Sequence, residues 1–235
     1  MIELQQLCRT FLVGDQTVRA LDRVDLCIDQ GEYLSVMGPS GSGKSTLLNI
    51  LGLLDTPDAG EYLFNQEATS KLKEERRAAL RAAHIGFVFQ SYHLIPRLTA
   101  WENVELPLVL SGIAAKERRP IVDEMVERLG LTERAAHLPN QLSGGQRQRV
   151  AIGRAIVMKP QLLLADEPTG NLDSQSGREV TDLLEELNRG GITLLVVTHD
   201  EAIGSRAARH ITMIDGRIAA DRLSPHAQKQ GSKKH

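Results

Sequence analysis

The segment EYLSVMGPSGSGKSTLLNILGLL, from Glu32 to Leu54, joins a strand-like apolar run to a helix-like apolar run through a turn rich in glycine and serine. This turn, Gly38 to Ser45, matches G-x-x-x-x-G-K-[ST], the pattern of loops that bind phosphate groups. At average residue frequencies, the pattern arises by chance in about one of a hundred sequences of this length. An ordinary Gly-Ser turn is therefore the weaker interpretation, and the segment predicts a phosphate-binding loop between a buried strand and a helix.

The chemistry of such a loop predicts a bound nucleotide and a divalent cation. Its glycines let backbone N–H groups surround the β-phosphate, the Lys44 ammonium reaches the β- and γ-phosphates, and the Ser45 hydroxyl ligates Mg²⁺. We therefore expect ATP and Mg²⁺ here. The residues expected to contact ATP are Gly38, Pro39, Ser40, Gly41, Ser42, Gly43, Lys44, Ser45 and Thr46.

On both sides of this loop, short β-rich runs alternate with helical patterns. Several of the runs are apolar on both faces, as buried parallel strands require, so they predict an α/β fold with a P-loop NTPase core and a mainly parallel sheet. Residues before Gly31 form further strands, and Ile211 to Ala220 reads as a hairpin, which predicts an additional N-terminal antiparallel β layer. The β-rich runs that alternate with helical patterns are Glu32 to Gly38, His84 to Gln90, Gln161 to Glu167 and Thr193 to Asp200.

The domain organisation follows from where strand patterns are missing. Residues 91–158 hold three stretches with apolar residues at helical spacing and no strand pattern, which predicts an inserted helical subdomain. We expect one domain over 1–223, with its core in 1–90 and 159–223. Residues 224–235 are polar and basic without periodicity, so a disordered tail is expected; contact of its lysines with a membrane surface is the less favoured alternative.

Composition narrows the class of protein. With 41% hydrophobic residues the chain can bury a full core, and a net charge of −2 gives no reason to expect nucleic acid as a partner. No apolar run reaches the roughly 18 residues that span a bilayer, and the start MIELQQLCRTF lacks the build of a signal peptide, so we expect a cytoplasmic chain. Cys8 and Cys27 fall in predicted strands, where buried reduced thiols are favoured over a disulfide or a metal site.

Polar residues follow three of the predicted strands. Asp166, at the end of LLLADE, is placed to hold Mg²⁺, and Glu167 to orient or deprotonate the attacking water. His199 and Gln90 end two other strands, at the edge where α/β domains bind ligands. Each of these residues alone is more often structural, and only the set favours catalysis. We expect Glu167, His199 and Gln90 to be catalytic and Ser45, Gln90 and Asp166 to ligate the metal.

The segment NQLSGGQRQRVAIGRAI, Asn140 to Ile156, predicts a second anion site, because Ser143 and two glycines open a basic amphipathic helix. Since one ATP fills one loop, a second copy of the chain would bring its ATP to this site in a head-to-tail C2 dimer. The alternative is a simple helix cap, with Arg147, Arg149 and Arg154 on a solvated face. Nucleic acid is not expected there, because no aromatic residues interleave with the arginines.

Together these motifs resemble the nucleotide-binding subunit of ATP-binding cassette (ABC) transporters, over nearly the whole chain. GPSGSGKST looks like the Walker A motif, Gln90 the Q-loop, LSGGQ the family signature, LLLADE the Walker B strand with Glu167 as catalytic base, and His199 the H-loop. The resemblance implies an ATPase that forms a homodimer on binding ATP. The residues implied to contact the ATP of the partner copy are Ser143, Gly144, Gly145, Gln146 and, in the D-loop, Asp173.

The resemblance also implies how adenine is bound. The family places an aromatic residue, usually tyrosine, ahead of Walker A to stack on the base, and Phe11 occupies that place here. A phenylalanine ring keeps the π-face needed for stacking but loses the hydroxyl. Val18 is implied to pack against the same base, and packing under the strands is the alternative for Phe11.

Within the family, GFVFQSYHLIPRLTAWENVELPL and ADEPTGNLD look most like the lipoprotein-release and macrolide-export group. This implies a membrane partner docked near Gln90 to Leu98 and a peripheral position on the inner face of the cell membrane. The apolar run Tyr92 to Ile95 fits that contact and a place in the core equally well. Because the sequence ends at His235, whereas the macrolide exporter fuses its ATPase to the membrane part, we expect a separate membrane subunit. Two alternatives remain: mechanical regulation without transport, and a soluble ABC ATPase acting on DNA or ribosomes, which is disfavoured.

Overall fold

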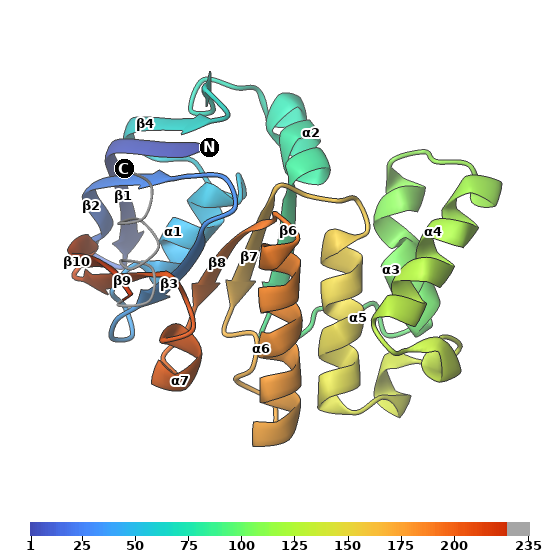
Figure 1. The fold of residues 1–235 in the computed structure, drawn as a ribbon. Helices are drawn as coiled ribbons and strands as arrows, with labels where there is room; N and C mark the ends of the chain where they lie inside the picture. The colour runs from blue at the N-terminus through green and yellow to red at the C-terminus, as the bar shows by residue number, and fades with distance from the viewer. Residues whose placement is uncertain (225–235) are drawn as a thin grey trace, which may run out of the picture.

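The computed structural model describes residues 1–224, which form two sheets with helices between and beside them (Figure 1). The strands are β1 (Ile2–Val13), β2 (Gln16–Ile28), β3 (Tyr33–Met37), β4 (Ala59–Phe64), β5 (Glu67–Ala68), β6 (Ile85–Phe89), β7 (Leu162–Asp166), β8 (Thr193–Val197), β9 (Arg209–Ile214) and β10 (Arg217–Leu223). The helices are α1 (Lys44–Leu51), α2 (Glu74–His84), α3 (Ala100–Leu110), α4 (Ala115–Arg128), α5 (Gly144–Ile156), α6 (Ser174–Arg189) and α7 (Glu201–Gly204), with 3₁₀ turns at Thr132–Arg134 and Pro139–Gln141.

The large sheet has the strand order β10-β9-β3-β8-β7-β6, and of its strand pairs only β9 and β10 are antiparallel. Strand β7 is buried from both sides. Leu162 and Leu164 share a core with α1, while Leu163 and Ala165 pack with α5 and α6. Burial on both faces explains the continuous apolar run in the sequence. The predicted α/β fold with a mainly parallel sheet is confirmed.

The small sheet, with the order β2-β1-β4-β5, is antiparallel throughout. Its inner face closes over α1, so that Leu4, Tyr62 and Leu48 belong to one core with the large sheet. An ion pair between Arg217 of β10 and Asp22 of β2, at 2.5 Å, ties the two sheets together. The predicted N-terminal antiparallel layer is confirmed.

Residues 91–158, all of them described, hold α3, α4 and α5 and no strand. These helices enclose a core of their own, and α5 lies between it and the sheet (Figure 1). Gly153 makes this position possible, because a Cβ there would lie 2.6 Å from the Leu129 side chain. On its other side α5 contributes Ile152 and Ile156 to the core of the large sheet. One helix therefore belongs to both parts of the predicted domain.

Two predictions about the periphery need correction. Cys27 is exposed and Cys8 half-buried, because Cys27 takes an outward position on a strand whose neighbours Leu26 and Ile28 face the core. Both thiols are free, as expected. Ser224, assigned to the tail, is buried and donates its N–H to the carbonyl oxygen of Ala208 at 2.8 Å. The rest of the predicted tail, 225–235, lies outside the described residues.

The carboxyl ends of β3, β8, β7 and β6 lie side by side, because these strands are neighbours in one parallel sheet. From these ends the chain continues into Gly38, Thr198, Glu167 and Gln90 respectively. The sheet thus gathers the phosphate-binding loop, the acid pair, the histidine and the glutamine at one edge, where open α/β sheets bind their ligands.

Candidate active site

The phosphate-binding loop runs from the end of β3 to the start of α1. Gly43, the residue before α1, has a φ of +97°, and a Cβ there would lie 2.1 Å from the carbonyl oxygen of Ala20, so only glycine fits. No side chain caps this helix. The N–H groups of its first turn therefore point into the loop without a helical partner, and the helix dipole favours an anion there.

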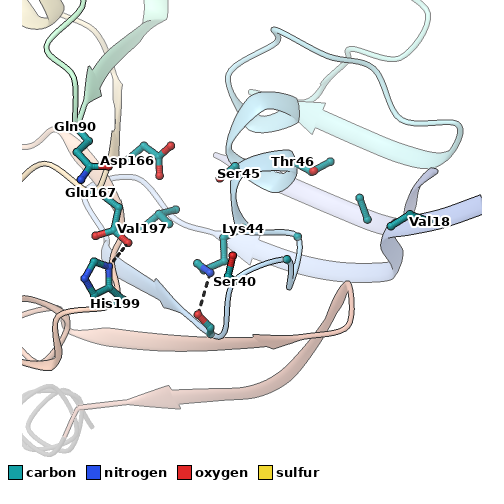
Figure 2. A pocket seen from close by; sticks show the side chains of 14 residues that line it. Val18, Ser40, Lys44, Ser45, Thr46, Gln90, Asp166, Glu167, Val197 and His199 are labelled. Atoms are coloured by element: carbon teal, nitrogen blue, oxygen red, sulfur yellow. Dashed lines mark hydrogen bonds and ion pairs between the residues drawn. The ribbon is translucent and has the colours of Figure 1, made fainter. Parts of the chain in front are cut away.

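Lys44, the first residue of α1, lies across the loop. Its ammonium group donates hydrogen bonds to the carbonyl oxygens of Gly38 and Pro39, both at 2.9 Å. These neutral acceptors hold the ammonium in place and leave its charge uncompensated. Figure 2 shows Lys44 in the middle of the site, with Ser45 and Thr46 following it on α1. The loop thus presents one positive charge together with a helix start.

The acid pair lies opposite Lys44 at the end of β7. Burial is the main cause that raises the pKa of Asp166; the charge of Glu167 adds to the rise, and Lys44 opposes it. Glu167 has a φ of +47° and donates its backbone N–H to Val197 of β8 at 2.9 Å. A left-handed backbone is uncommon in a residue other than glycine, and such strain concentrates at functional sites.

The Glu167 carboxylate contacts the segment after β8. Its Oε1 lies 2.7 Å from Nδ1 of His199, and its Oε2 lies 3.3 Å from the Thr198 hydroxyl. The hydrogen bond to Glu167 is the main cause that raises the pKa of His199. Because the His199 side chain is 75% exposed, it remains open to a ligand while it holds the carboxylate. In Figure 2, Glu167 and His199 face Lys44, with Gln90 and Asp166 beside them.

These side chains line one cleft of about 580 Å³, a volume typical of small-molecule sites. The predicted residues on its wall are Val18, Gly38, Ser40, Gly41, Gly43, Lys44, Ser45, Thr46, Gln90, Asp166, Glu167 and His199. Two further wall residues, Ala20 and Val197, were not predicted.

Three residues expected to contact ATP are not on this wall. Pro39 contributes its carbonyl oxygen to the Lys44 contact, and the Ser42 side chain is buried within the loop. Phe11 lies opposite Val18 in the β1–β2 pair and is 38% exposed. The Arg9 guanidinium lies 4.8 Å from the centre of the Phe11 ring, so one face of the ring already has a cationic neighbour.

The expected metal ligands Ser45, Gln90 and Asp166 all border the cleft. Within residues 1–224, no group of three or more His, Cys, Asp or Glu side chains is arranged to hold a metal ion. One carboxylate with a hydroxyl and an amide suits Mg²⁺ instead, since this ion keeps waters and phosphate oxygens among its ligands. The donor set therefore fits an Mg²⁺ ion that arrives with a nucleotide.

The second predicted anion site, at the start of α5, is not part of the cleft wall. The Ser143 hydroxyl accepts the N–H of Gln146 at 3.2 Å, and the Gln146 side chain accepts the N–H of Ser143 at 2.9 Å. Gly145 lets this end of α5 pack on α6, because a Cβ there would lie 3.0 Å from Ser176. Gly144 is half-buried beside Leu172.

Asp173 caps the neighbouring helix α6. Its carboxylate accepts the N–H groups of Gln175 and Ser176, each at 3.0 Å, and the bonds to Ser176 are the main cause that lowers its pKa. The residues expected to contact a partner's ATP thus lie at the starts of two adjoining helices. In the described part of the chain they are separate from the cleft that this chain lines itself.

Sequence reasoning missed the contacts that hold Gln90. Its side chain donates to Oδ1 of Asn171 at 3.4 Å, and Asn171 donates back to the Gln90 carbonyl oxygen at 3.0 Å. The alternative interpretation, which placed the arginines of α5 on a solvated face, is wrong for two of them. Arg154 donates to main-chain oxygens after β6, and Arg147 lies 5.1 Å from the Tyr92 ring centre. No local pattern predicts these contacts, because the residues are far apart in the sequence.

The family model described as ABC transporter matches residues 21–170. This chain belongs to the ABC transporter family. The resemblance expected from the motifs is confirmed, and with it the identification of the chain as the ATPase cassette of this family.

Relatives of this ABC cassette include two proteins named macrolide export ATP-binding/permease protein MacB, from Burkholderia pseudomallei (strain 1710b) and Rhodopseudomonas palustris (strain HaA2). Each is 51% identical over 97% of this chain and 35% of its own length. The chain therefore spans about a third of the length of these curated relatives.

Solved structures of the ATP-binding cassette MJ0796 share the fold. One is a dimeric post-hydrolysis state bound to ADP and Pi, with 44% identity and a TM-score of 0.88 over 95% of this chain and 98% of that one. A second, described as the dimeric structure of a bacterial ABC transporter cassette, has 45% identity and the same TM-score.

Proposed function

We propose that this ABC ATPase works as an ATP-driven homodimer that powers a membrane permease for export or lipoprotein release. The observation that carries the proposal is the division of the site. One cleft holds Lys44, Glu167 and His199, whereas the capped start of α5 at Ser143 lies outside it. Two copies of the chain would complete two equivalent sites. The dimeric MJ0796 cassettes and the macrolide-export relatives support this reading.

Binding of ATP is assigned to the phosphate-binding loop and to the hairpin of β1 and β2. The first-turn N–H groups of α1 and the ammonium of Lys44 would receive the phosphates. Ser45, Asp166 and Gln90 would hold Mg²⁺, which supplies charge neutralisation of the phosphate oxygens when bound. We assign the adenine to Val18, which borders the cleft, and to the free face of Phe11.

Hydrolysis is assigned to Glu167 as general base. A carboxylate at this place accepts a proton from the attacking water. The contacts to His199 and Thr198, at 2.7 Å and 3.3 Å, fix the direction of the two carboxylate oxygens. His199 remains exposed enough to reach the γ-phosphate as well. Loss of that phosphate would remove the contact that favours the closed dimer, and the dimer would open.

The permease is assigned to a groove between α2, β6, α3 and α5, next to residues 90–98. The groove measures about 520 Å³ and is lined mainly by apolar side chains. Leu110 on its edge is 78% exposed, and we assign this side chain to the contact with the permease. None of the helices in residues 1–224 has the length and apolarity needed to span a bilayer. The proposed location is the inner face of the cell membrane, through this groove.

The proposal is tested with Glu167→Gln, which keeps the shape of the side chain and removes the base. The variant is expected to bind ATP normally, to lose about 10² to 10³-fold in kcat, and to remain as an ATP-bound dimer on a sizing column. Glu133→Gln, at an exposed carboxylate outside the cleft, serves as the matched control and should behave as wild type. Normal turnover of Glu167→Gln contradicts the base assignment.

The partner is tested by capture of tagged Glu167→Gln from native membranes with Mg-ATP. Recovery of a protein with few transmembrane helices and a large domain outside the membrane supports the export and lipoprotein-release assignment. An importer-like permease with many helices contradicts the assigned group and leaves the ATPase chemistry standing. Recovery of soluble or ribosomal proteins alone contradicts the membrane role.

A further inference from the structure

The loop after β6 has an unusual backbone. Tyr92 and His93 have φ values of +60° and +47°, two consecutive residues other than glycine in the left-handed region. This conformation is unfavourable for each of them, and it persists only where the surroundings hold it. The loop begins with Gln90, whose side chain reaches the nucleotide cleft.

A single guanidinium, that of Arg154 in the last turn of α5, contacts both strained residues. Its Nη1 donates to the carbonyl oxygen of His93 at 2.6 Å, and its Nη2 donates to that of Tyr92 at 2.9 Å. Two parallel donors in a fixed fork suit two adjacent carbonyl oxygens. Arg154 therefore clamps the backbone at the two residues that need support.

In the described residues, the contacts to Tyr92 and His93 are the hydrogen bonds of the Arg154 guanidinium. It forms no ion pair with a carboxylate there, and burial of the guanidinium lowers its pKa. The guanidinium thus loses hydration and receives only neutral acceptors in return. A neutral side chain could fill this space at a lower cost, so the contact to the loop is the feature that distinguishes arginine here.

Two further contacts hold this part of the loop. Strand β6 packs directly on α5, because a Cβ at Gly86 would lie 2.4 Å from the carbonyl oxygen of Ala155. Where the loop begins, Asn171 contacts the side chain and the carbonyl oxygen of Gln90, and its own carbonyl oxygen accepts from the Tyr92 hydroxyl at 3.4 Å. The contacts of Arg154 thus join α5 to the loop whose first residue is Gln90.

We propose that Arg154 is a positioning residue, which fixes Gln90 at the nucleotide cleft by clamping the Tyr92–His93 backbone onto α5. The start of the same helix carries Ser143, the residue assigned above to the ATP of a partner copy. Arg154 therefore couples contact with one ATP to the position of Gln90 beside the other. This consequence for catalysis rests on the proposed function, whereas the clamp itself does not.

The experiment compares Arg154→Met and Arg154→Lys with wild type in the full chain. Hydrogen exchange at the amides of Tyr92 and His93, which bond to Phe89 and Ser91, reports the clamp directly. We expect exchange there to accelerate about tenfold in Arg154→Met. Lysine keeps the charge but lacks the fork, so Arg154→Lys should give an intermediate rate. Arg149 lies on α5 like Arg154 and pairs with Glu179 of α6, so Arg149→Met is the matched control and should leave these amides unchanged.

Steady-state kinetics give the second measurement. If Arg154 positions Gln90, kcat falls about tenfold in Arg154→Met while the Kd for ATP stays within about twofold, with partial recovery in Arg154→Lys. If exchange at Tyr92 and His93 is unchanged in Arg154→Lys and in any folded Arg154→Met, the clamp is refuted. Faster exchange with an unchanged kcat refutes the catalytic coupling. If wild type itself hydrolyses no ATP, the proposed function fails, and the exchange rates still decide on the clamp.

Discussion

The chain contains two helix starts that suit an anion, and they are built differently. At the start of α1, Gly43 has no side chain to offer, so no cap uses the N–H groups of the first turn. At the start of α5, Ser143 and Gln146 cap each other reciprocally. The first start is open to phosphate at once, whereas the second must exchange a cap contact before it can accept one.

Their surroundings differ as well. Around α1 the sheet edge supplies Lys44, Asp166, Glu167 and His199, so the charges needed for binding and hydrolysis are all in one cleft. Around the start of α5, Asp173 is occupied as the cap of α6. The difference supports the proposal that the cleft at α1 carries out the chemistry. The start of α5 would recognise whether a second ATP is present.

The largest effect on ATP binding is expected from removing the charge of Lys44 at the start of α1. Lys44→Ala removes the ammonium that lies over the loop, and each charge-assisted bond to a phosphate contributes roughly 2 kcal/mol. We expect kcat/KM for ATP to fall by about 10²-fold or more and the Kd for ATP to rise. Lys116→Ala, at an exposed position of α4, controls for loss of a lysine. Nearly normal ATP binding by Lys44→Ala would show that backbone groups alone make the site.

A smaller effect is expected from a substitution at the start of α5, and it should change dimer formation but not ATP binding by the single chain. Ser143→Arg places bulk and charge at the proposed interface while leaving the cleft intact. The variant should bind ATP within about twofold of wild type, and its ATP-dependent dimer should weaken by at least about tenfold in a sedimentation experiment.

Loss of a helix cap is the competing explanation for that result. Thr99→Arg provides the matched control, because Thr99 caps α3 with the same reciprocal arrangement, to Glu102. Both variants lose a cap that contributes about 1 kcal/mol to stability. If both weaken the dimer equally, the effect is one of stability, and the role of α5 in the dimer is contradicted.

The contrast between the two starts also shows what the sequence could predict. Several features could be predicted because each depends on residues adjacent in the chain. They are the phosphate-binding loop, the strand ends at Glu167 and His199, and the helix start at Ser143. The mainly parallel sheet was predicted too, since buried parallel strands have apolar runs in their sequence. The order of β3, β8, β7 and β6 in that sheet was not predicted. Local patterns were sufficient wherever a feature is local.

The contacts between loops could not be predicted in the same way. Arg154 has the spacing of an amphipathic helix face, and only packing against β6 reveals that it contacts Tyr92 and His93. Asn171 lies in a turn, where its contact with Gln90 leaves no mark on the sequence. The burial predicted for Cys27 was wrong because it rested on the residue type, whereas the alternation with Leu26 and Ile28 turns Cys27 outward.

The smallest effect is expected from a change of pH. It concerns the contact between Glu167 and His199, which face Lys44 across the cleft. Glu167 raises the pKa of His199, so folding favours the imidazolium form. The stability contributed by the pair is present in full below the unfolded pKa of about 6.5, and it is lost as pH rises through the higher folded value. Because His199 is largely exposed, water screens the interaction, and the change in the free energy of unfolding should be small.

The pair can be isolated by NMR titration of the histidines in wild type and in Glu167→Gln. We expect the pKa of His199 to lie above 6.5 in wild type and to move back toward it in the variant, because a neutral amide no longer favours the charged ring. The NMR signals of the other histidines serve as internal references. A His199 pKa that is unaffected by the substitution would mean that the contact does not persist in solution. The orientation of the Glu167 carboxylate would then depend on its left-handed backbone and on Thr198 alone. His199 would contribute less to the position of the proposed base than the geometry implies.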